Sequence, residues 1–147
     1  MNYPGGSFAE ALNLGLKKSA GEYILFKDET SILMRDSLEI AAKFIEVSKA
    51  EVIHFAGRIR LDGKFILDDS PELKRDVPIL FDAPKQFRAA MWLQNKLSRR
   101  LDTKLFSKKF LTRQELKCGD DLSEFLFQAL ISAKNYLLVP KTFSIIK

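Results

Sequence analysis

The chain has 147 residues, of which 46% are hydrophobic and 29% are charged, with a formal net charge of +5. This length and composition are typical of one globular domain, so we expect residues 1–147 to form a single domain, and no apolar run reaches the 18 residues that a membrane-spanning helix needs. Cys118 is the single cysteine and cannot form an internal disulfide, which favours a reducing compartment and a cytoplasmic location.

The N-terminal third predicts a helix followed by a strand. Ser7 and Glu10 have the spacing of a capping box, so a helix is expected to begin there, and Gly21 is expected to end it. The apolar run 23–26 that follows is typical of a strand buried on both faces. A strand after a helix indicates an αβ unit of a layered sheet.

The middle of the chain predicts a second helix, a strand and a β-hairpin. The helix is expected to begin at Asp36, with its buried side formed by Leu38, Ala41, Ala42 and Ile45. Residues 51–55 predict a strand, and residues 58–67 predict a hairpin because Asp62-Gly63 suits a tight type I′ turn. Residues 68–84 contain three prolines and predict a surface loop.

Residues 85–101 predict a third helix with one basic side. Between residues 85 and 109 there are eight lysines and arginines against one aspartate, which concentrates the positive charge in this segment. On a helical wheel the apolar side contains Leu93 and Leu97. The opposite side carries Lys85, Arg88, Trp92, Lys96 and Arg99. This side is expected to contact an anionic membrane surface or another polyanion; a solvated helix face and nucleic acid phosphates are the alternatives.

The C-terminal part predicts three further elements. Leu105-Phe106 is expected to be extended, residues 121–133 to form a helix, and residues 136–139 to form a strand that Pro140 ends. Because helices and strands alternate along the chain, the sequence predicts an α/β fold with a mixed sheet flanked by helices.

Two acidic motifs are candidates for chemistry. Asp28-Glu29-Thr30 follows the first predicted strand, and adjacent carboxylates at a strand end can hold a hard divalent cation. Gly119-Asp120-Asp121 precedes the last predicted helix, where an aspartate can act as a general base. The alternatives are a polar turn for the first motif and a helix N-cap for the second.

The order of these motifs resembles the family 2 inverting glycosyltransferases of the GT-A fold. Residues 2–31 read NYPGGSFAEALNLGLKKSAGEYILFKDETS, which is similar to the family pattern that leads into its acidic D-x-D motif. AEVIHF at 50–55, Lys104-Leu105-Phe106 with Phe110-Leu111, and Gly119-Asp120-Asp121 with Phe125 are similar to later family elements, in the same order. The resemblance implies a partial GT-A-like sheet with a β-hairpin insertion at 58–67.

The resemblance also implies a reaction and its residues. It implies transfer of a sugar, with inversion, from a nucleotide-sugar to a polysaccharide or glycolipid acceptor. Asn13, Asp28 and Glu29 would contact the donor, and Asp28, Glu29 and Thr30 would lie at a divalent metal, Mn or Mg. Asp121, with Asp120 beside it, would supply the general base. The implied location is the inner face of the membrane, with peripheral contact and without specific nucleic acid binding.

Two departures from the family pattern lead to a second hypothesis. Thr30 stands where the D-x-D motif has its final aspartate, and a neutral hydroxyl is a poorer cation ligand than a carboxylate. The family's first strands, which hold the nucleotide, are expected to precede Asn2, so we expect an N-terminally truncated domain. An incomplete sheet exposes a strand edge, which predicts self-association. The alternative function is that of a non-catalytic, glycosyltransferase-like binding or scaffold protein.

Overall fold

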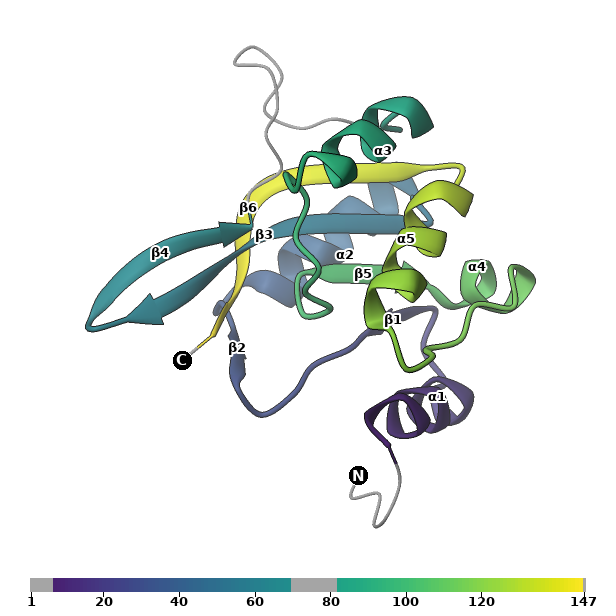
Figure 1. The fold of residues 1–147 in the computed structure, drawn as a ribbon, viewed down its shortest axis with the longest axis horizontal. Helices are drawn as coiled ribbons and strands as arrows, with labels where there is room; N and C mark the ends of the chain where they lie inside the picture. Colours follow the sequence, from purple (N-terminus) through teal and green to yellow (C-terminus); the bar gives the residue numbers. More distant parts are fainter. Residues whose placement is uncertain (1–6, 70–81, 147) are drawn as a thin grey trace.

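The computed structural model describes residues 7–69 and 82–146, which form a mixed β-sheet with helices on both faces (Figure 1). The elements in chain order are α1 (Phe8–Lys18), β1 (Tyr23–Leu25), β2 (Ser31–Leu33), α2 (Ser37–Ser48), β3 (Val52–Leu61), β4 (Lys64–Asp69), α3 (Lys85–Leu93), β5 (Lys104–Ser107), α4 (Lys108–Arg113), α5 (Leu122–Ser132) and β6 (Tyr136–Ile146).

The sheet has the strand order β1-β5-β3-β6-β2, and β4 extends it as the hairpin partner of β3. β3 and β6 run parallel, whereas every other pair is antiparallel. Figure 1 shows α3 and α5 on one face, α2 behind the sheet, and α1 below β1. The predicted α/β fold, with a mixed sheet flanked by helices, is confirmed.

Alternate residues of the central strands enter two separate cores, because successive side chains of a strand point to opposite faces. On β3, Val52 packs into the core beneath α3 and α5, whereas Ile53 and Phe55 pack into the core beneath α2. On β6, Leu138 and Leu137 divide in the same way. Burial on both faces explains why these strands are continuous apolar runs rather than alternating ones.

The first helix begins as predicted and ends earlier than predicted. Ser7 and Glu10 form both hydrogen bonds of the capping box, and β1 begins at Tyr23. The helix ends at Lys18, so Gly21 does not end it. Ser19 takes that role because its N–H donates to Gly15 O at 2.9 Å and its hydroxyl donates to Leu16 O at 2.7 Å. These bonds satisfy carbonyls that the helix end leaves open.

The predicted buried side of α2 is confirmed at Ala41 and Ile45 and is wrong at Leu38 and Ala42. Leu38 is 60% exposed and Ala42 is exposed, whereas Ser37 and Ala41 are buried. The reason is a polar anchor at the start of the helix: the Ser37 hydroxyl donates to Phe143 O of β6 at 2.6 Å. This bond turns Ser37 toward the sheet, and Leu38, one residue later on the helix, points away from it.

The predicted hairpin is confirmed, and one predicted strand end is wrong. Asp62 and Gly63 have φ values of 47° and 77°, as a tight turn with two positive φ angles requires. β6 continues through Pro140 instead of ending there. The register to β3 shifts at this point, since Val139 lies opposite Phe55 and the next pair joins Ala56 to Thr142. A bulge accommodates the missing proline N–H. Most of the predicted loop 68–84 lies outside the described residues, and residues 68 and 69 belong to β4.

The helix predicted over 85–101 ends at Leu93, and two residues of its predicted basic side, Arg88 and Trp92, are buried. Arg88 is only 1% exposed and donates to the carbonyls of Leu130 and Ala133 at the end of α5, the second at 2.9 Å. A guanidinium has five donors, so it serves carbonyls that the end of α5 leaves open. Desolvation by burial lowers the pKa of Arg88 from its usual value.

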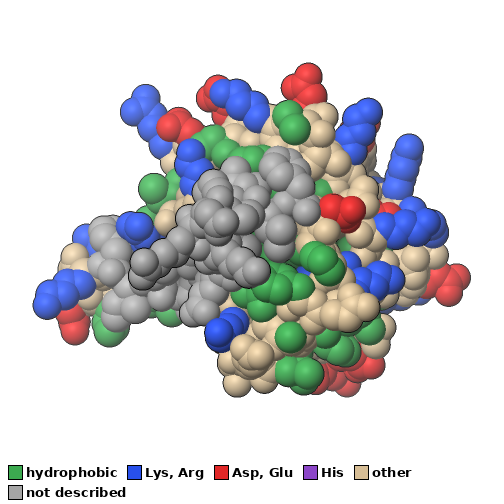
Figure 2. All heavy atoms as spheres, turned by 90° about the horizontal axis from the view of Figure 1, so that it is seen from above, with side chains coloured by type: hydrophobic (Ala, Val, Ile, Leu, Met, Phe, Trp, Pro, Cys, Tyr) green, Lys and Arg blue, Asp and Glu red, His purple; other side chains and the backbone are tan. Residues whose placement is uncertain are grey.

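Trp92 also lies inside the molecule, 8% exposed and packed against Phe127 of α5. Leu93, predicted to be buried, is 77% exposed. In Figure 2 the lysine and arginine side chains of the viewed face are spread around its rim, with acidic side chains among them. Within residues 7–69 and 82–146, no helix is long and apolar enough to cross a membrane.

Candidate functional site

A hollow of about 250 Å³ lies where β1 ends. It is bounded by α1, by the residues that follow β1, by the segment before β5, by the first residue of α5 and by the end of β6. The lining residues are of two kinds: an apolar set of Phe8, Leu12, Phe26, Leu101, Leu122 and Ile146, and a charged set, named the rim, of Lys27, Asp28, Arg99, Arg100 and Asp102. The hollow therefore combines apolar surface with a few convergent charges, as small-molecule sites do.

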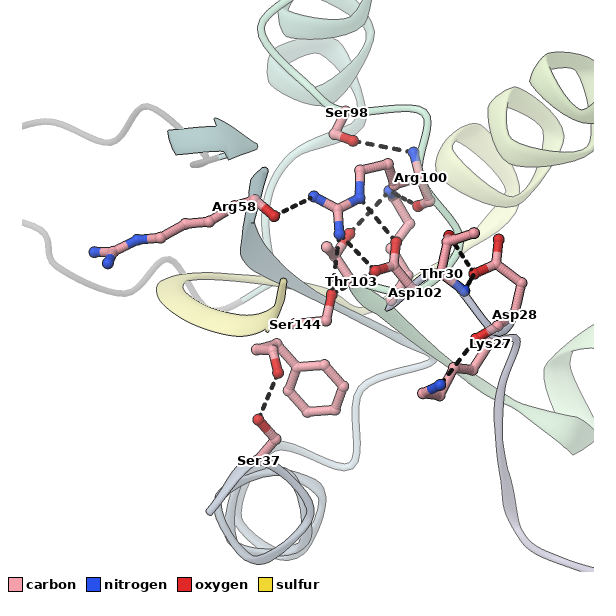
Figure 3. Close-up of polar contacts among 12 residues, drawn as sticks. Lys27, Asp28, Thr30, Ser37, Arg58, Ser98, Arg100, Asp102, Thr103 and Ser144 are labelled. Atoms are coloured by element: carbon pink, nitrogen blue, oxygen red, sulfur yellow. Dashed lines mark hydrogen bonds and ion pairs between the residues drawn. The ribbon is translucent and has the colours of Figure 1, made fainter. Parts of the chain in front are cut away.

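The acidic motif after β1 forms a tight turn on this rim (Figure 3). Asp28 Oδ1 accepts hydrogen bonds from the Thr30 N–H at 2.9 Å and from the Thr30 hydroxyl at 2.6 Å. The hydroxyl bond is the main cause of a lowered Asp28 pKa, because it favours the charged form. Lys27 Nζ donates to Asp28 O at 2.8 Å. The turn thus presents an exposed, ionised carboxylate beside an exposed ammonium group.

A second charged group on the rim is buried, and the sequence did not predict it. Arg100 Nε donates to Asp102 Oδ1 at 2.9 Å, and a terminal nitrogen of Arg100 lies 2.5 Å from Asp102 Oδ2. The Ser144 hydroxyl donates to Asp102 Oδ2 at 2.5 Å (Figure 3). Asp102 is 8% exposed, and Ser144 is fully buried. A bidentate pair of this kind fixes the guanidinium in position.

Gly57 of β3 makes room for this pair. A Cβ at Gly57 would lie 2.6 Å from a terminal nitrogen of Arg100 and 2.7 Å from Thr103 Cγ2. Glycine inside a strand marks a close approach of another group. This glycine was the one sequence signal that could have pointed to a side chain held against β3.

The predicted general base lies near the rim and caps a helix. Asp121 is the N-cap of α5, and its carboxylate accepts from the Ser123 N–H at 2.9 Å. Both Asp120 and Asp121 are exposed. Leu122, the next residue, lines the hollow, so Asp121 lies at its border. The predicted N-cap is therefore confirmed, and its carboxylate is exposed to solvent.

Asn13 links two separate parts of the structure through its side-chain amide. Its Nδ2 donates to Cys118 O at 2.7 Å, and its Oδ1 accepts from Cys118 N–H at 2.8 Å. It does not line the hollow. This clasp ties α1 to the segment that leads into Asp120 and Asp121, and the donor contact of Asn13 stays a prediction. Burial raises the pKa of the clasped Cys118 thiol to about 11.

The residues present do not form a metal centre of their own. Within the part of the chain that the structure describes, no three His, Cys, Asp or Glu side chains are grouped so that they could hold a metal ion. The Thr30 hydroxyl donates a hydrogen bond to Asp28 Oδ1. This bond occupies one of the two carboxylate oxygens that a cation would use. The turn offers Asp28 and the adjacent Glu29, which is fewer protein ligands than a divalent ion takes without help from a substrate.

Comparisons with known proteins match this geometry to one fold. No family model matches the chain. A curated relative, an uncharacterized glycosyltransferase of Rickettsia bellii (strain RML369-C), is 39% identical over 59 residues, which are 40% of this chain and 9% of that protein. The structure of residues 1–349 of S. aureus TarS superposes with a TM-score of 0.75 at 16% identity, over 97% of this chain and 40% of that one.

Two further TarS structures are complexes with ligands. The complex of TarS 1–349 with UDP has a TM-score of 0.73 at 15% identity and covers 93% of this chain and 39% of that one. The complex with UDP-GlcNAc has a TM-score of 0.67 at 17% identity and covers 90% and 36%. The chain therefore spans less than half the length of the proteins it matches. Its sheet and helices share the fold of the part of TarS that they cover.

Proposed function

We propose that this domain binds a nucleotide-sugar in the hollow at the end of β1 and takes part in transfer of the sugar, with inversion, to a polysaccharide or glycolipid acceptor. One observation carries the proposal: the hollow, with an ionised Asp28 and several cations on its rim, lies in a domain with the TarS fold. Structures of TarS contain UDP and UDP-GlcNAc. Ligands in open α/β sheets bind outside the carboxyl ends of strands, where this hollow lies.

The proposed roles follow from charge and position. The acceptor oxygen attacks the anomeric carbon, the bond from that carbon to the diphosphate oxygen breaks, and the acceptor proton passes to Asp121. Asp120 lies beside the base, and Asp28, which lines the hollow, would contact the donor together with the adjacent Glu29. The apolar lining, which includes Phe26 and Leu101, would keep water away from the sugar. Exclusion of water strengthens every charge interaction in the hollow.

A bound divalent metal, Mn²⁺ or Mg²⁺, stays a prediction. Such ions bind through one or two carboxylates together with substrate phosphates, and Asp28 with Glu29 would be the protein ligands here. A bound ion would neutralise charge on the leaving diphosphate. Because the turn lacks a third ligand, no step above depends on the ion.

The experiment is a calorimetric titration of the purified chain with UDP in the presence of Mn²⁺. We expect saturable binding, and for Asp28→Asn a change in the dissociation constant of about tenfold or more, because the substitution removes a negative charge from the rim. The constant rises if the carboxylate holds Mn²⁺ and falls if it only repels the diphosphate. Glu39→Gln on α2 is the matched control, because Glu39 is an exposed carboxylate outside the hollow. Absence of UDP binding by the folded chain would contradict the proposal.

The second candidate function is a non-catalytic binding or scaffold role, and the Thr30 hydroxyl bond to Asp28 favours it. Thr30→Asp separates the two candidates. If the donor site has lost its cation ligand, this substitution will create Mn²⁺-dependent UDP binding that the wild type lacks. If the wild type already binds UDP, this result favours the first candidate function, sugar transfer.

Two contacts complete the proposal. Lys85 and Lys96 are exposed, lie outside the hollow and would contribute to peripheral contact with an anionic membrane. β1 ends the sheet on one side, with β5 as its one strand partner within the described residues, so this edge is available for self-association. Sedimentation with vesicles containing phosphatidylserine measures the membrane contact, and light scattering of the purified chain measures self-association.

A further inference from the structure

We propose that Lys27 and Arg99 hold the diphosphate of the nucleotide directly, so that binding in the hollow needs no divalent metal. This inference rests on the proposed function and assigns a specific device to the same site. It starts from the disagreement between the acidic turn and a cation site: Thr30 donates to Asp28, and no grouping of three metal-ligating side chains exists among the described residues.

The first argument is the charge that a diphosphate meets in the hollow. The rim carries three cationic and two acidic side chains. Asp102 is paired with Arg100, so this pair adds little net charge. What remains is the Asp28 carboxylate against Lys27 and Arg99. The rim therefore attracts an anionic ligand without an added cation, whereas a rim of carboxylates alone would repel it.

The second argument is the availability and orientation of the two cations. Lys27 is exposed, and its ammonium group spends one of three donors on Asp28 O. Arg99 is exposed, and its guanidinium lies 4.6 Å from the centroid of the Trp92 ring. The buried indole holds the guanidinium plane, while the contact to Asn95 Oδ1 is long, at 3.4 Å. Most Arg99 donors thus remain for a phosphate, which a planar fork binds well.

The third argument separates Arg99 from its neighbour. Arg100 contacts Asp102, Ser144 and Arg58 O, and its side chain is 13% exposed. Its donors serve the protein. Arg99 and Arg100 are adjacent in the sequence but differ in role: Arg100 fixes the wall of the hollow, and Arg99 reaches into solvent at its rim.

The test is a calorimetric titration with UDP in EDTA and, separately, in Mn²⁺. We expect dissociation constants within about threefold of each other, and we expect Lys27→Ala and Arg99→Ala each to weaken binding about tenfold, as loss of a charge-assisted hydrogen bond does. Lys43→Ala is the control, since Lys43 is an exposed lysine on α2, outside the hollow. Binding should also weaken steeply as salt rises from 50 to 300 mM, because the contacts are exposed.

Three results would count against it, in distinguishable ways. Binding that occurs only with Mn²⁺ and is unchanged in the Lys27→Ala/Arg99→Ala double variant overturns this inference and leaves the proposed function standing. Absence of UDP binding in both conditions, from a chain that unfolds cooperatively, overturns the proposed function together with it. Equal weakening by Lys43→Ala shows non-specific attraction to net charge and also overturns the inference.

Discussion

Two charged groups lie on the rim of one hollow, and they are built in opposite ways. The Arg100–Asp102–Ser144 cluster is buried, with all its partners inside the protein. The Asp28–Thr30 turn, with Lys27, is exposed, and Asp28 accepts hydrogen bonds from its neighbours Thr30 and Ser31. A buried charge must be paired to be tolerated, whereas an exposed one can exchange water for a ligand. We therefore infer that the cluster fixes the wall of the hollow and that the turn is the part that contacts a ligand.

The largest expected effect is loss of the cluster's anion. Asp102→Ala leaves the Arg100 guanidinium without its carboxylate, and removing one partner of a buried pair costs about 3–5 kcal/mol in the free energy of unfolding. Urea denaturation followed by circular dichroism measures this. Glu39→Ala, in the exposed ion pair with Lys43, should cost less than about 1 kcal/mol. Equal costs for the two variants would contradict the distinction between the buried ion pair and the exposed one.

A steric substitution tests the same cluster from the side of β3. Gly57→Ala places a Cβ 2.6 Å from the Arg100 guanidinium, and overpacking of this kind costs about 1–3 kcal/mol. Gly119→Ala is the matched control, because no atom lies within 4 Å of its added Cβ. Thermal unfolding of the two variants makes the comparison. A Gly57→Ala variant as stable as Gly119→Ala would show that the guanidinium moves freely.

The clasp between α1 and the segment before α5 should have an intermediate effect. Asn13→Ala removes two hydrogen bonds to Cys118, at a cost of about 1–2 kcal/mol. In the wild type, a pKa of about 11 keeps the buried Cys118 thiol protonated at pH 8, so iodoacetamide should react slowly. The variant should react faster as the clasp opens, which intact mass measures over time. Ser132→Ala, in α5, serves as the control.

The smallest effect on stability is expected at the exposed turn. Thr30→Val removes the hydroxyl that chiefly lowers the Asp28 pKa, so that pKa should rise toward its ordinary value. A lowered pKa contributes stability above the unfolded-state pKa, and that stability is lost as the pH falls through the folded-state pKa. Because Asp28 is exposed, the free energy of unfolding should change little between the variant and the wild type, even in acid. A carbon-detected NMR titration of the Asp28 carboxyl measures the shift.

Local patterns in the sequence predicted most of the fold. The capping box at Ser7 and the Asp62-Gly63 turn form as expected because a few neighbouring residues determine them. Positions that depend on distant partners were missed. Arg88 was predicted on a basic face, and it lies inside because carbonyls of α5, more than 40 residues away, receive its donors. A helical wheel contains no information about such partners.

The candidate site divides in the same way. Asp28 and Thr30 were identified because they follow a strand directly, and Asp121 because it precedes a helix. Arg100 and Asp102 gave no pattern, since their partner Ser144 is 42 residues further along the chain. Asn13 was recognised by a motif, but its role depends on Cys118, 105 residues away. Residues that work through long-range contacts become visible only when the sheet is assembled.

The central claim is that the hollow at the end of β1 is a nucleotide site, and chemical-shift mapping with UDP tests it most directly. We predict that the amide signals of Asp28, Thr30, Leu101 and Asp102 shift in a saturable way, while those of α2 on the opposite face do not. Shifts confined to other surfaces, or no shifts at millimolar UDP in a well-dispersed spectrum, would contradict the claim.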